Sequence, residues 1–343
     1  MRHFLLQLAL RVRNLFPLLG ALRPAWFCGL CLLPVCSITH AAEADNYPQK
    51  PIHLIVPFPP GGAVDILGRL LGQHLSEQFS QSVVIDNRPG ANGNLAMEAL
   101  IKLPADGYSL LIAGNGLATN GILYPKSTYS MPRDFSAIGY VGQAPLIMVV
   151  SKNSPYQSLQ EIVAAARKAP GVLTYASAGN GSSAHLGAEL LKYTAKIDLT
   201  HIAYKGGAPA MIDLVGDRVT LMLLDPAQVM PQLKAERLRA IAVGTTKRVT
   251  LLPEVQTMEE AGYPKLETTV WWGVVGPANI PEFIMNKLNA GLNRALADPL
   301  TAAKLSELGV TSKPGTSTEF RSFLLDEMSK WSTVVKSAEI RGD

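Results

Sequence analysis

Cysteine is scarce in this chain of 343 residues and is confined to its beginning. The three cysteines, Cys28, Cys31 and Cys36, lie within the first 44 residues. The remaining sequence therefore argues against disulfide cross-links, thiol catalysis and cysteine metal sites. Charged residues are also few, at 17%, whereas hydrophobic residues make up 48%. This balance is typical of a compact protein with a substantial core.

Signatures of common catalytic sites are absent as well. The chain contains no G-x-x-x-x-G-K-[ST] phosphate loop and no G-x-S-x-G nucleophile turn. Gly179-Asn180-Gly181 is only a fragment of a dinucleotide-binding fingerprint. The histidines after residue 44, His53, His74, His185 and His201, lack the spacing of a metal pair. We therefore expect no cofactor, no bound metal and no catalytic residue.

The first 44 residues have the composition of an export signal. Four arginines precede an apolar run over residues 25–38, and small residues follow it. Ala42-Glu43-Ala44 predicts cleavage after Ala44, and cleavage after Ala41 is the alternative. A permanent membrane anchor is disfavoured because the apolar run is short and contains Pro34. We therefore expect an exported protein.

The predicted leader also accounts for most of the net charge of +4. It holds four of the 31 basic residues and one of the 27 acidic residues, so the rest of the chain is almost neutral. Nucleic-acid-binding domains usually carry a clustered excess of lysine and arginine. We therefore expect no nucleic-acid partner.

Short aliphatic runs alternate with helical patterns along the rest of the chain. The expected strands are 52–56, 83–87, 108–113, 137–141, 146–151, 173–177, 199–204, 219–223 and 238–243, and residues 268–277 are extended. The expected helices are 65–79, 92–102, 182–194, 208–216, 281–297, 299–308 and 317–337. This alternation predicts an α/β protein with parallel sheets and crossover helices.

Two glycine-bearing loops stand out where a strand is followed by a helix. They are PFPPGGAVD, residues 57–65, and AGNGSSAH, residues 178–185. Such loops lie at the carboxyl ends of strands, where open α/β sheets bind ligands. A helix N-terminus attracts anions through its unpaired amides, and glycine permits a close approach to the backbone. The loops therefore predict two amide cradles for a carboxylate that face each other across a cleft.

The polar residues beside these loops permit more than one interpretation. Asp65 either caps its helix or bonds loop amides or a ligand, and Ser182 and Ser183 either cap the next helix or donate to a ligand. We expect His185 to be neutral, because the positive end of a helix disfavours its protonation. The competing hypothesis is a secreted hydrolase or isomerase that uses Ser182 or Ser183 with His185 and Asp65.

An ordered set of stretches carries a family resemblance. Residues 47–52 read YPQKPI, and then come PFPPGGAVD, VVIDNRPGANGN, ADGYSLL, GNGSSAHLGAELL, YKGGAPAMIDLVGDRV, LRAIAV and WWGVVGP. This series resembles the Bordetella uptake gene (Bug) family, the extracytoplasmic solute-binding proteins of tripartite tricarboxylate transporters. The resemblance covers the chain from about Tyr47 to the last predicted helix.

The resemblance implies a two-domain Venus-flytrap fold of the periplasmic-binding-protein type, with a ligand cleft between the domains. The expected division is a signal peptide over 1–44, a first domain built from 45–145 and 248–343, and a second domain over 146–247. The implied partners are a small carboxylated solute, such as a dicarboxylate, an acidic amino acid or an aromatic carboxylate, and the permease subunits of the transporter. We expect a monomer, and a sensor subunit for a signalling partner is the alternative role.

The resemblance also implies which residues bind the solute. The two glycine-bearing loops clamp one carboxylate, largely through backbone amides and ordered water. The variable stretches GNGLATNG and LDPAQ contain no arginine, so a ligand with one or two carboxylates and a modest polar or aromatic body is favoured over citrate. The expected ligand-binding residues are Phe58, Pro60, Gly61, Gly62, Ala63, Asp65, Asn115, Thr119, Ser177, Asn180, Gly181, Ser182, Ser183, His185, Lys205, Gly206, Gly207, Ala208, Asp225 and Trp271. Trp271 and Trp272 are expected to point to opposite faces of a strand, so that at most one lines the cleft.

Overall fold

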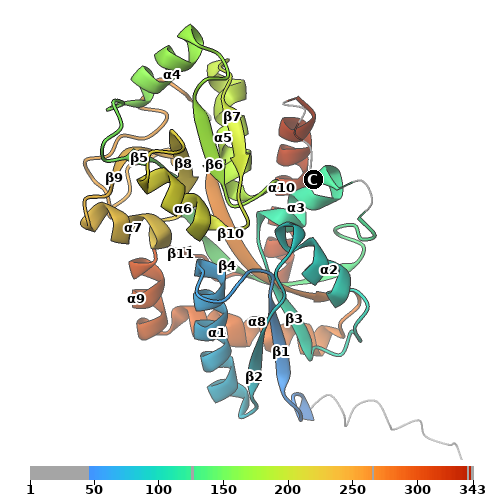
Figure 1. Ribbon diagram of the computed structural model, residues 1–343. Coiled ribbons are helices and arrows are strands. Elements are labelled where there is room, and N and C mark those ends of the chain that lie inside the picture. Colours follow the sequence, from blue (N-terminus) through green and yellow to red (C-terminus); the bar gives the residue numbers. More distant parts are fainter. Residues whose placement is uncertain (1–45, 125–126, 265, 338–339, 341–343) are drawn as a thin grey trace, which may run out of the picture. The chain divides into compact units, whose positions relative to one another are not determined.

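The computed structural model of the protein describes residues 46–124, 127–264, 266–337 and 340 (Figure 1). The predicted leader and its cleavage position lie outside these residues. The described chain forms two sheets, one of six strands and one of five. None of its helices is both long enough and apolar enough to cross a bilayer.

The first sheet has the strand order β11-β4-β10-β3-β1-β2. The three strands at one edge, β3, β1 and β2, are parallel, since Leu54 of β1 is in register with Ile85 of β2 and with Leu110 of β3. Strand β10 is antiparallel to both of its neighbours, β3 and β4. The strands are β1 (Ile52–Val56), β2 (Val83–Asn87), β3 (Ser109–Ala113), β4 (Phe135–Pro145), β10 (Thr269–Pro277) and β11 (Thr311–Ser312).

Helices cover both faces of this sheet. Alternate strand residues such as Leu110 and Leu111 enter two separate apolar clusters, because successive side chains of a strand point to opposite faces. Helices α1 and α8 pack on one face, and α2 and α10 on the other. The helices are α1 (Ala63–Phe79), α2 (Asn94–Leu100) after the 3₁₀ turn η2 (Ala91–Gly93), α3 (Asn115–Leu123), α8 (Glu282–Ala297), α9 (Pro299–Glu307) and α10 (Ser317–Ser337).

The second sheet has the order β7-β6-β8-β5-β9 and is also covered on both faces. Helices α4 and α5 pack on one face, and α6 and α7 on the other. Its strands are β5 (Ile147–Ser151), β6 (Thr174–Ser177), β7 (Thr200–Ala203), β8 (Leu221–Leu224) and β9 (Leu238–Val243). Its helices are α4 (Leu159–Lys168), α5 (Ser183–Ala195), α6 (Gly207–Val215) and α7 (Pro226–Lys234).

The predicted α/β class is confirmed, but both sheets are mixed, whereas the alternation of strand and helix predicted parallel sheets. Strand β5 is antiparallel to β8 and β9, and β10 is antiparallel to β3 and β4. These strands follow or precede the passages of the chain from one sheet to the other. The alternation of strand and helix in the sequence carries no information on where such a passage occurs.

The chain passes from one sheet to the other twice, at Leu146 and over residues 244–268, and these two passages are hydrogen-bonded to each other. The Leu146 amide donates to the Thr268 carbonyl, the Thr268 amide to the Gly244 carbonyl, and the Gly244 amide to the Leu146 carbonyl, each at 2.9 Å. A Cβ atom at Gly244 would lie 1.9 Å from Thr268 Oγ1, so only glycine fits there. The connection is a closed ring of backbone bonds.

Candidate functional site

The first loop, residues 57–62, joins β1 to α1 and is organised by Asp65. One carboxylate oxygen of Asp65 accepts from the Gly61 amide and from Arg69 Nε, both at 2.9 Å, and the other accepts from Asn87 Nδ2 at 3.0 Å. Burial of Asp65 raises its pKa, but these hydrogen bonds outweigh that effect and lower the pKa to about 2. Of the roles predicted for Asp65, the structure shows the hydrogen bond to a loop amide and not the helix cap.

The second loop, residues 178–182, joins β6 to α5 in the same way. Ser182 is the N-cap of α5, and its hydroxyl accepts from the His185 amide at 3.3 Å. His185 Nδ1 accepts from the Gly181 amide at 3.0 Å. His185 is therefore a hydrogen-bond acceptor within the loop.

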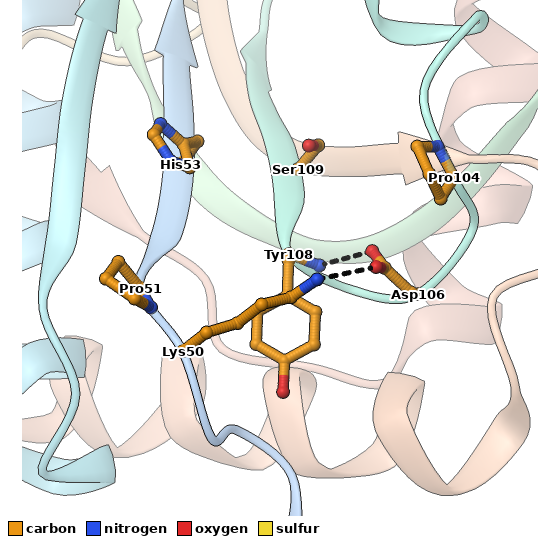
Figure 2. Close-up of a pocket in the computed structure, with 7 residues that line it drawn as sticks. All are labelled: Lys50, Pro51, His53, Pro104, Asp106, Tyr108 and Ser109. Atoms are coloured by element: carbon orange, nitrogen blue, oxygen red, sulfur yellow. Dashed lines mark hydrogen bonds and ion pairs between the residues drawn. The ribbon is translucent and has the colours of Figure 1, made fainter.

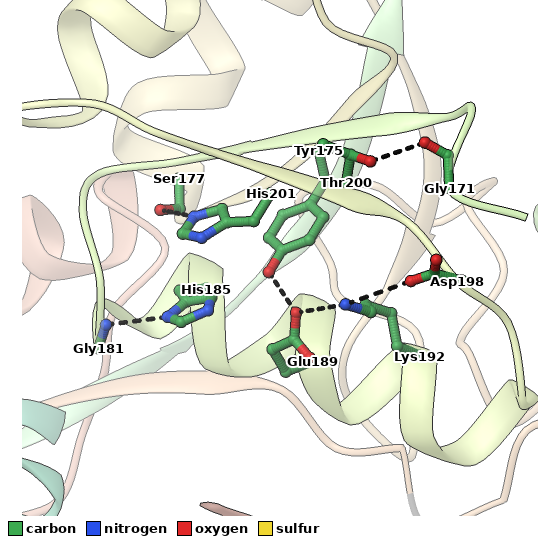
Figure 3. A network of polar contacts seen from close by, with 10 residues as sticks. All are labelled: Gly171, Tyr175, Ser177, Gly181, His185, Glu189, Lys192, Asp198, Thr200 and His201. Atoms are coloured by element: carbon green, nitrogen blue, oxygen red, sulfur yellow. Dashed lines mark hydrogen bonds and ion pairs between the residues drawn. The ribbon is translucent and has the colours of Figure 1, made fainter. Parts of the chain in front are cut away.

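His185 belongs to a stack of three rings (Figure 3). Its imidazole lies 4.1 Å from that of His201, with 7° between the planes, and the Tyr175 ring is stacked 4.7 Å from His201 and 6.3 Å from His185. Burial lowers the pKa of His185 to about 3, and His201 and Lys192 contribute in the same direction. The expected neutral histidine is confirmed, although burial is the main cause.

Side chains from the first sheet reach the second loop. Asn92 Nδ2, in η2, donates to the Gly181 carbonyl at 2.8 Å and to Asn120 Oδ1 at 3.2 Å. A Cβ atom at Gly181 would lie 2.7 Å from Leu123 Cδ1. Asn92 is not among the predicted ligand-binding residues, although the Gly90-x-x-Gly93 pattern of its loop is visible in the sequence.

Several of the predicted ligand-binding side chains form hydrogen bonds to other residues of the protein. Asn115 bridges α3 to β10, because its Nδ2 donates to the Thr269 carbonyl and its Oδ1 accepts from the Trp271 amide. The buried Thr119 hydroxyl donates to the Asn115 carbonyl at 3.1 Å. The Trp271 indole donates to Glu327 at 2.9 Å. Trp271 and Trp272 enter different core clusters, which confirms their opposite directions.

The remaining candidates lie at or next to the starts of α6 and α7, and Gly206, just before α6, is bonded to the second loop. The Gly206 amide donates to the Ala178 carbonyl at 3.1 Å. A Cβ atom at Gly207 would collide with the Gln228 side chain, whose Nε2 donates to one carboxylate oxygen of Asp225, while the Gln228 backbone amide donates to the other. Burial raises the pKa of Asp225 above its usual range, and the bonds from Gln228 oppose this rise. Lys205, Ala208, Phe58, Pro60, Gly62, Ala63 and Ser183 are partly or fully exposed, Asn180 is half-buried and Ser177 is buried.

The arrangement does not support a serine hydrolase. Ser182 Oγ contacts the backbone amide of His185, while the imidazole Nδ1 is directed at Gly181. The hydroxyl that bonds a histidine ring is instead that of Ser177, whose Oγ lies 2.6 Å from His201 Nε2. Ser177 is fully buried, so it cannot reach a substrate.

The hollow shown in Figure 2 lies at the end of the first sheet where β1 and β3 begin, opposite to the end where the loop of residues 57–62 follows β1. It has a volume of about 280 Å³ and is lined by residues that precede or begin β1 and β3, including Lys50 and Tyr108. Lys50 Nζ is paired with Asp106 at 3.3 Å and lies 4.3 Å from the Tyr108 ring centre. Within the described residues, no group of three or more His, Cys, Asp or Glu side chains is arranged to hold a metal ion.

The sequence matches a protein-family model over residues 67–340. The model describes the receptor of the tripartite tricarboxylate transporter family. The chain belongs to this receptor family. The family consists of solute receptors of transporters, so this receptor is not an enzyme, and the resemblance to the Bug proteins is confirmed.

Solved structures of related proteins support the fold. The receptor is 35% identical to Rpa4515 of R. palustris, solved with adipate, with a TM-score of 0.82 over 86% of this chain and 99% of that one. For the periplasmic binding protein BugD the identity is 30% and the TM-score 0.80, over 87% and 100% of the chains. For MatC of Rhodopseudomonas palustris with bound malate the values are 28% and 0.78, over 84% and 100%. The two-domain periplasmic-binding-protein fold is therefore confirmed, with two mixed sheets.

Asp65→Asn is expected to remove a pH-dependent part of the stability. Because the folded state lowers the pKa of Asp65 to about 2, its contribution is fully present above the unfolded pKa of about 3.9 and is lost as the pH falls towards 2. The variant should lose about 1–3 kcal/mol of unfolding free energy at pH 7. Urea denaturation from pH 7 to pH 2.5 measures this difference, which should shrink below pH 4. A difference that does not change with pH would contradict the assignment.

Proposed function

We propose that this receptor captures a small carboxylated solute in the periplasm and delivers it to the membrane subunits of a tripartite tricarboxylate-type transporter. The proposal is supported by membership of the receptor family and by the adipate and malate bound to two relatives. In this proposal the carboxylate is held by backbone amides, with water, at the N-termini of α1 and α5.

The observation that carries the proposal is the open start of α1. Gly62, the N-cap of this helix of 17 residues, is exposed, and no side chain caps the helix. A Cβ atom built at Gly62 would meet only the Pro59 carbonyl oxygen, at 3.8 Å. The first turn of a helix leaves amides without intrahelical partners, and these amides attract anions. An accessible helix start without a cap suits a carboxylate.

The candidate residues divide into two groups in this proposal. The first loop and Lys205 are mostly exposed, and residues 178–180 of the second loop are partly exposed, so we assign contact with the solute to the two loops and Lys205. Asn115, Thr119, Asp225 and Trp271 have their polar side-chain atoms bonded within the protein, so we assign them the role of shaping the site. Asn92 joins the second group because its Nδ2 is bonded to the Gly181 carbonyl and to Asn120.

A solute with one or two carboxylates and a modest polar or aromatic body fits this site best. Residues 114–121 and 224–228 contain no arginine, so a citrate-like trianion lacks a strong counter-ion beyond Lys205. Adipate and malate, the ligands of two relatives, are the first compounds to test. Aromatic monocarboxylates and acidic amino acids extend the panel.

Export and domain division complete the proposal. The leader over residues 1–44 directs the chain to the periplasm, and the mature receptor is a monomer. Its first domain consists of residues 45–145 and 248–343, and its second domain of residues 146–247. This division is supported by the sheets, since β5 to β9 form one sheet and the other strands form the second.

A thermal-shift screen of the receptor purified from the periplasmic fraction tests the proposal. A solute at about 100 times its Kd stabilises the folded state by roughly 2.7 kcal/mol, which is readily detected. We expect at least one carboxylate of the panel to raise the Tm, and the matching amide or methyl ester to raise it less. The proposal fails if no carboxylate shifts the Tm. Mass spectrometry of the same sample gives the N-terminus, expected after Ala44 or Ala41.

A further inference from the structure

The two loops share one construction. Gly61 and Gly181 both have a left-handed backbone, with φ of 85° and 76°. Each glycine amide donates to the side chain four residues later, Gly61 to Asp65 at 2.9 Å and Gly181 to His185 at 3.0 Å. In both cases the acceptor lies in the first turn of the helix that follows. The loops are therefore equivalent in shape, although they belong to different sheets.

The acceptors differ in charge. Asp65 is an anion, and the residue four positions further on is Arg69, which bonds it. His185 is neutral, and the residue four positions further on is Glu189, which accepts from the Tyr175 hydroxyl and pairs with Lys192 (Figure 3). The first loop thus carries a fixed negative charge beneath its amides, and the second loop does not.

We propose that His185 is a positioning residue, which holds the Gly181 amide and fixes the second loop without adding a negative charge beneath the anion site. This inference rests on the proposed function. It replaces direct contact between the imidazole and the solute, because Nδ1 is occupied by the Gly181 amide and the ring is buried against His201.

Gly181 is held from two sides, which makes its position sensitive to His185. Its amide is bonded to His185 of the same loop, and its carbonyl accepts from Asn92, which η2 supplies from the first sheet. Loss of the His185 bond therefore frees the loop and misplaces the contact with Asn92. A carboxylate in place of the imidazole would preserve the bond but would repel a bound anion.

Two substitutions separate the hydrogen bond from packing. His185→Asn keeps an acceptor with the reach that Asp65 shows in the first loop, but it removes the ring from the stack. His185→Phe keeps a ring next to His201 but has no acceptor. His185→Asp restores an acceptor and adds the charge.

Calorimetric titration with adipate and with malate measures the effect on binding. We expect His185→Asn to stay within about 3-fold of the wild-type Kd, and His185→Phe and His185→Asp to weaken binding by about 10-fold or more. If His185→Phe binds as the wild type does, or if His185→Asn loses as much affinity as His185→Phe, the proposal is overturned.

A second measurement decides the proposal even if the wild type binds neither probe, a result that would count against the proposed solute class alone. Amide hydrogen exchange followed by NMR should show Gly181 protected in the wild type and in His185→Asn, and unprotected in His185→Phe. Selective ¹⁵N-histidine labelling should show Nδ1 of His185 unprotonated at pH 7. An exchange rate at Gly181 equal in the wild type and in His185→Phe would refute the positioning role.

Discussion

Gly62→Val is expected to abolish solute binding while the fold stays intact. The backbone of Gly62 is extended, with φ of −81° and ψ of 169°, so a β-branched residue fits it without strain. The added methyl groups would project into the open space at the start of α1, where the proposed carboxylate approaches the amides. Loss of this approach should weaken binding by about 100-fold or more, on the scale of two lost charge-assisted hydrogen bonds.

Gly62→Ala supplies the graded control for this prediction. A single added carbon should reduce affinity less than valine does, and urea unfolding should place both variants within about 0.5 kcal/mol of the wild type. Titration calorimetry with the best solute of the thermal-shift screen measures the affinities. Unchanged affinity in Gly62→Val would show that this loop is only a turn.

Glu327→Ala is expected to produce the largest loss of stability. The Glu327 carboxylate is buried, and one of its oxygens accepts from the indole nitrogens of Trp271 and Trp331, both at 2.9 Å. Alanine leaves two buried N–H groups without an acceptor, and each such group costs about 1–3 kcal/mol. Urea unfolding monitored by tryptophan fluorescence should therefore show a loss of about 3 kcal/mol or more.

Glu327→Gln separates the hydrogen bonds from the charge. Its amide oxygen can still accept from both indoles, and only the contact with the half-exposed Lys330 is lost. Such an ion pair contributes about 0–1 kcal/mol. Equal losses in Glu327→Gln and Glu327→Ala would show that the charge, and not the pair of indole bonds, stabilises this part of α10.

Local chemistry made a large part of the fold predictable. The boundaries of β1, β2 and β9 coincide with the prediction, because short aliphatic runs end at polar or turn-forming residues. The two glycine-bearing loops were found for a similar reason, since left-handed backbone at Gly61 and Gly181 requires glycine. The family resemblance then indicated that the loops act together.

The missed features depend on long-range contacts or on weak local signals. Helix α3 was not predicted because its Asn- and Gly-rich sequence has low helix propensity, and the bridge from Asn115 to β10 joins residues more than 150 positions apart. Helix α7 contains Pro231, which disfavours a helical prediction. Helix α4 was also not predicted, although its Ser158 cap and its amphipathic pattern are both visible in the sequence.

The histidine stack shows the same limit within the candidate site. The neutral imidazole of His185 was predicted only from its place in the first turn of a helix, where the helix dipole disfavours protonation. Its partners arrive from elsewhere in the fold, since His201 comes from β7 and Tyr175 from β6. A local pattern therefore indicates that a side chain is available for chemistry, but only the packed structure shows what that side chain bonds.

The ring of bonds between Leu146, Gly244 and Thr268 has a consequence for how the protein unfolds. Each of these residues donates to one of the other two and accepts from the remaining one, so none can leave without breaking two backbone bonds. Loss of order in one sheet thus removes bonding partners from the strands that lead into the other. This sharing of bonds joins the two sheets into one cooperative unit, in which partial unfolding of either sheet weakens both.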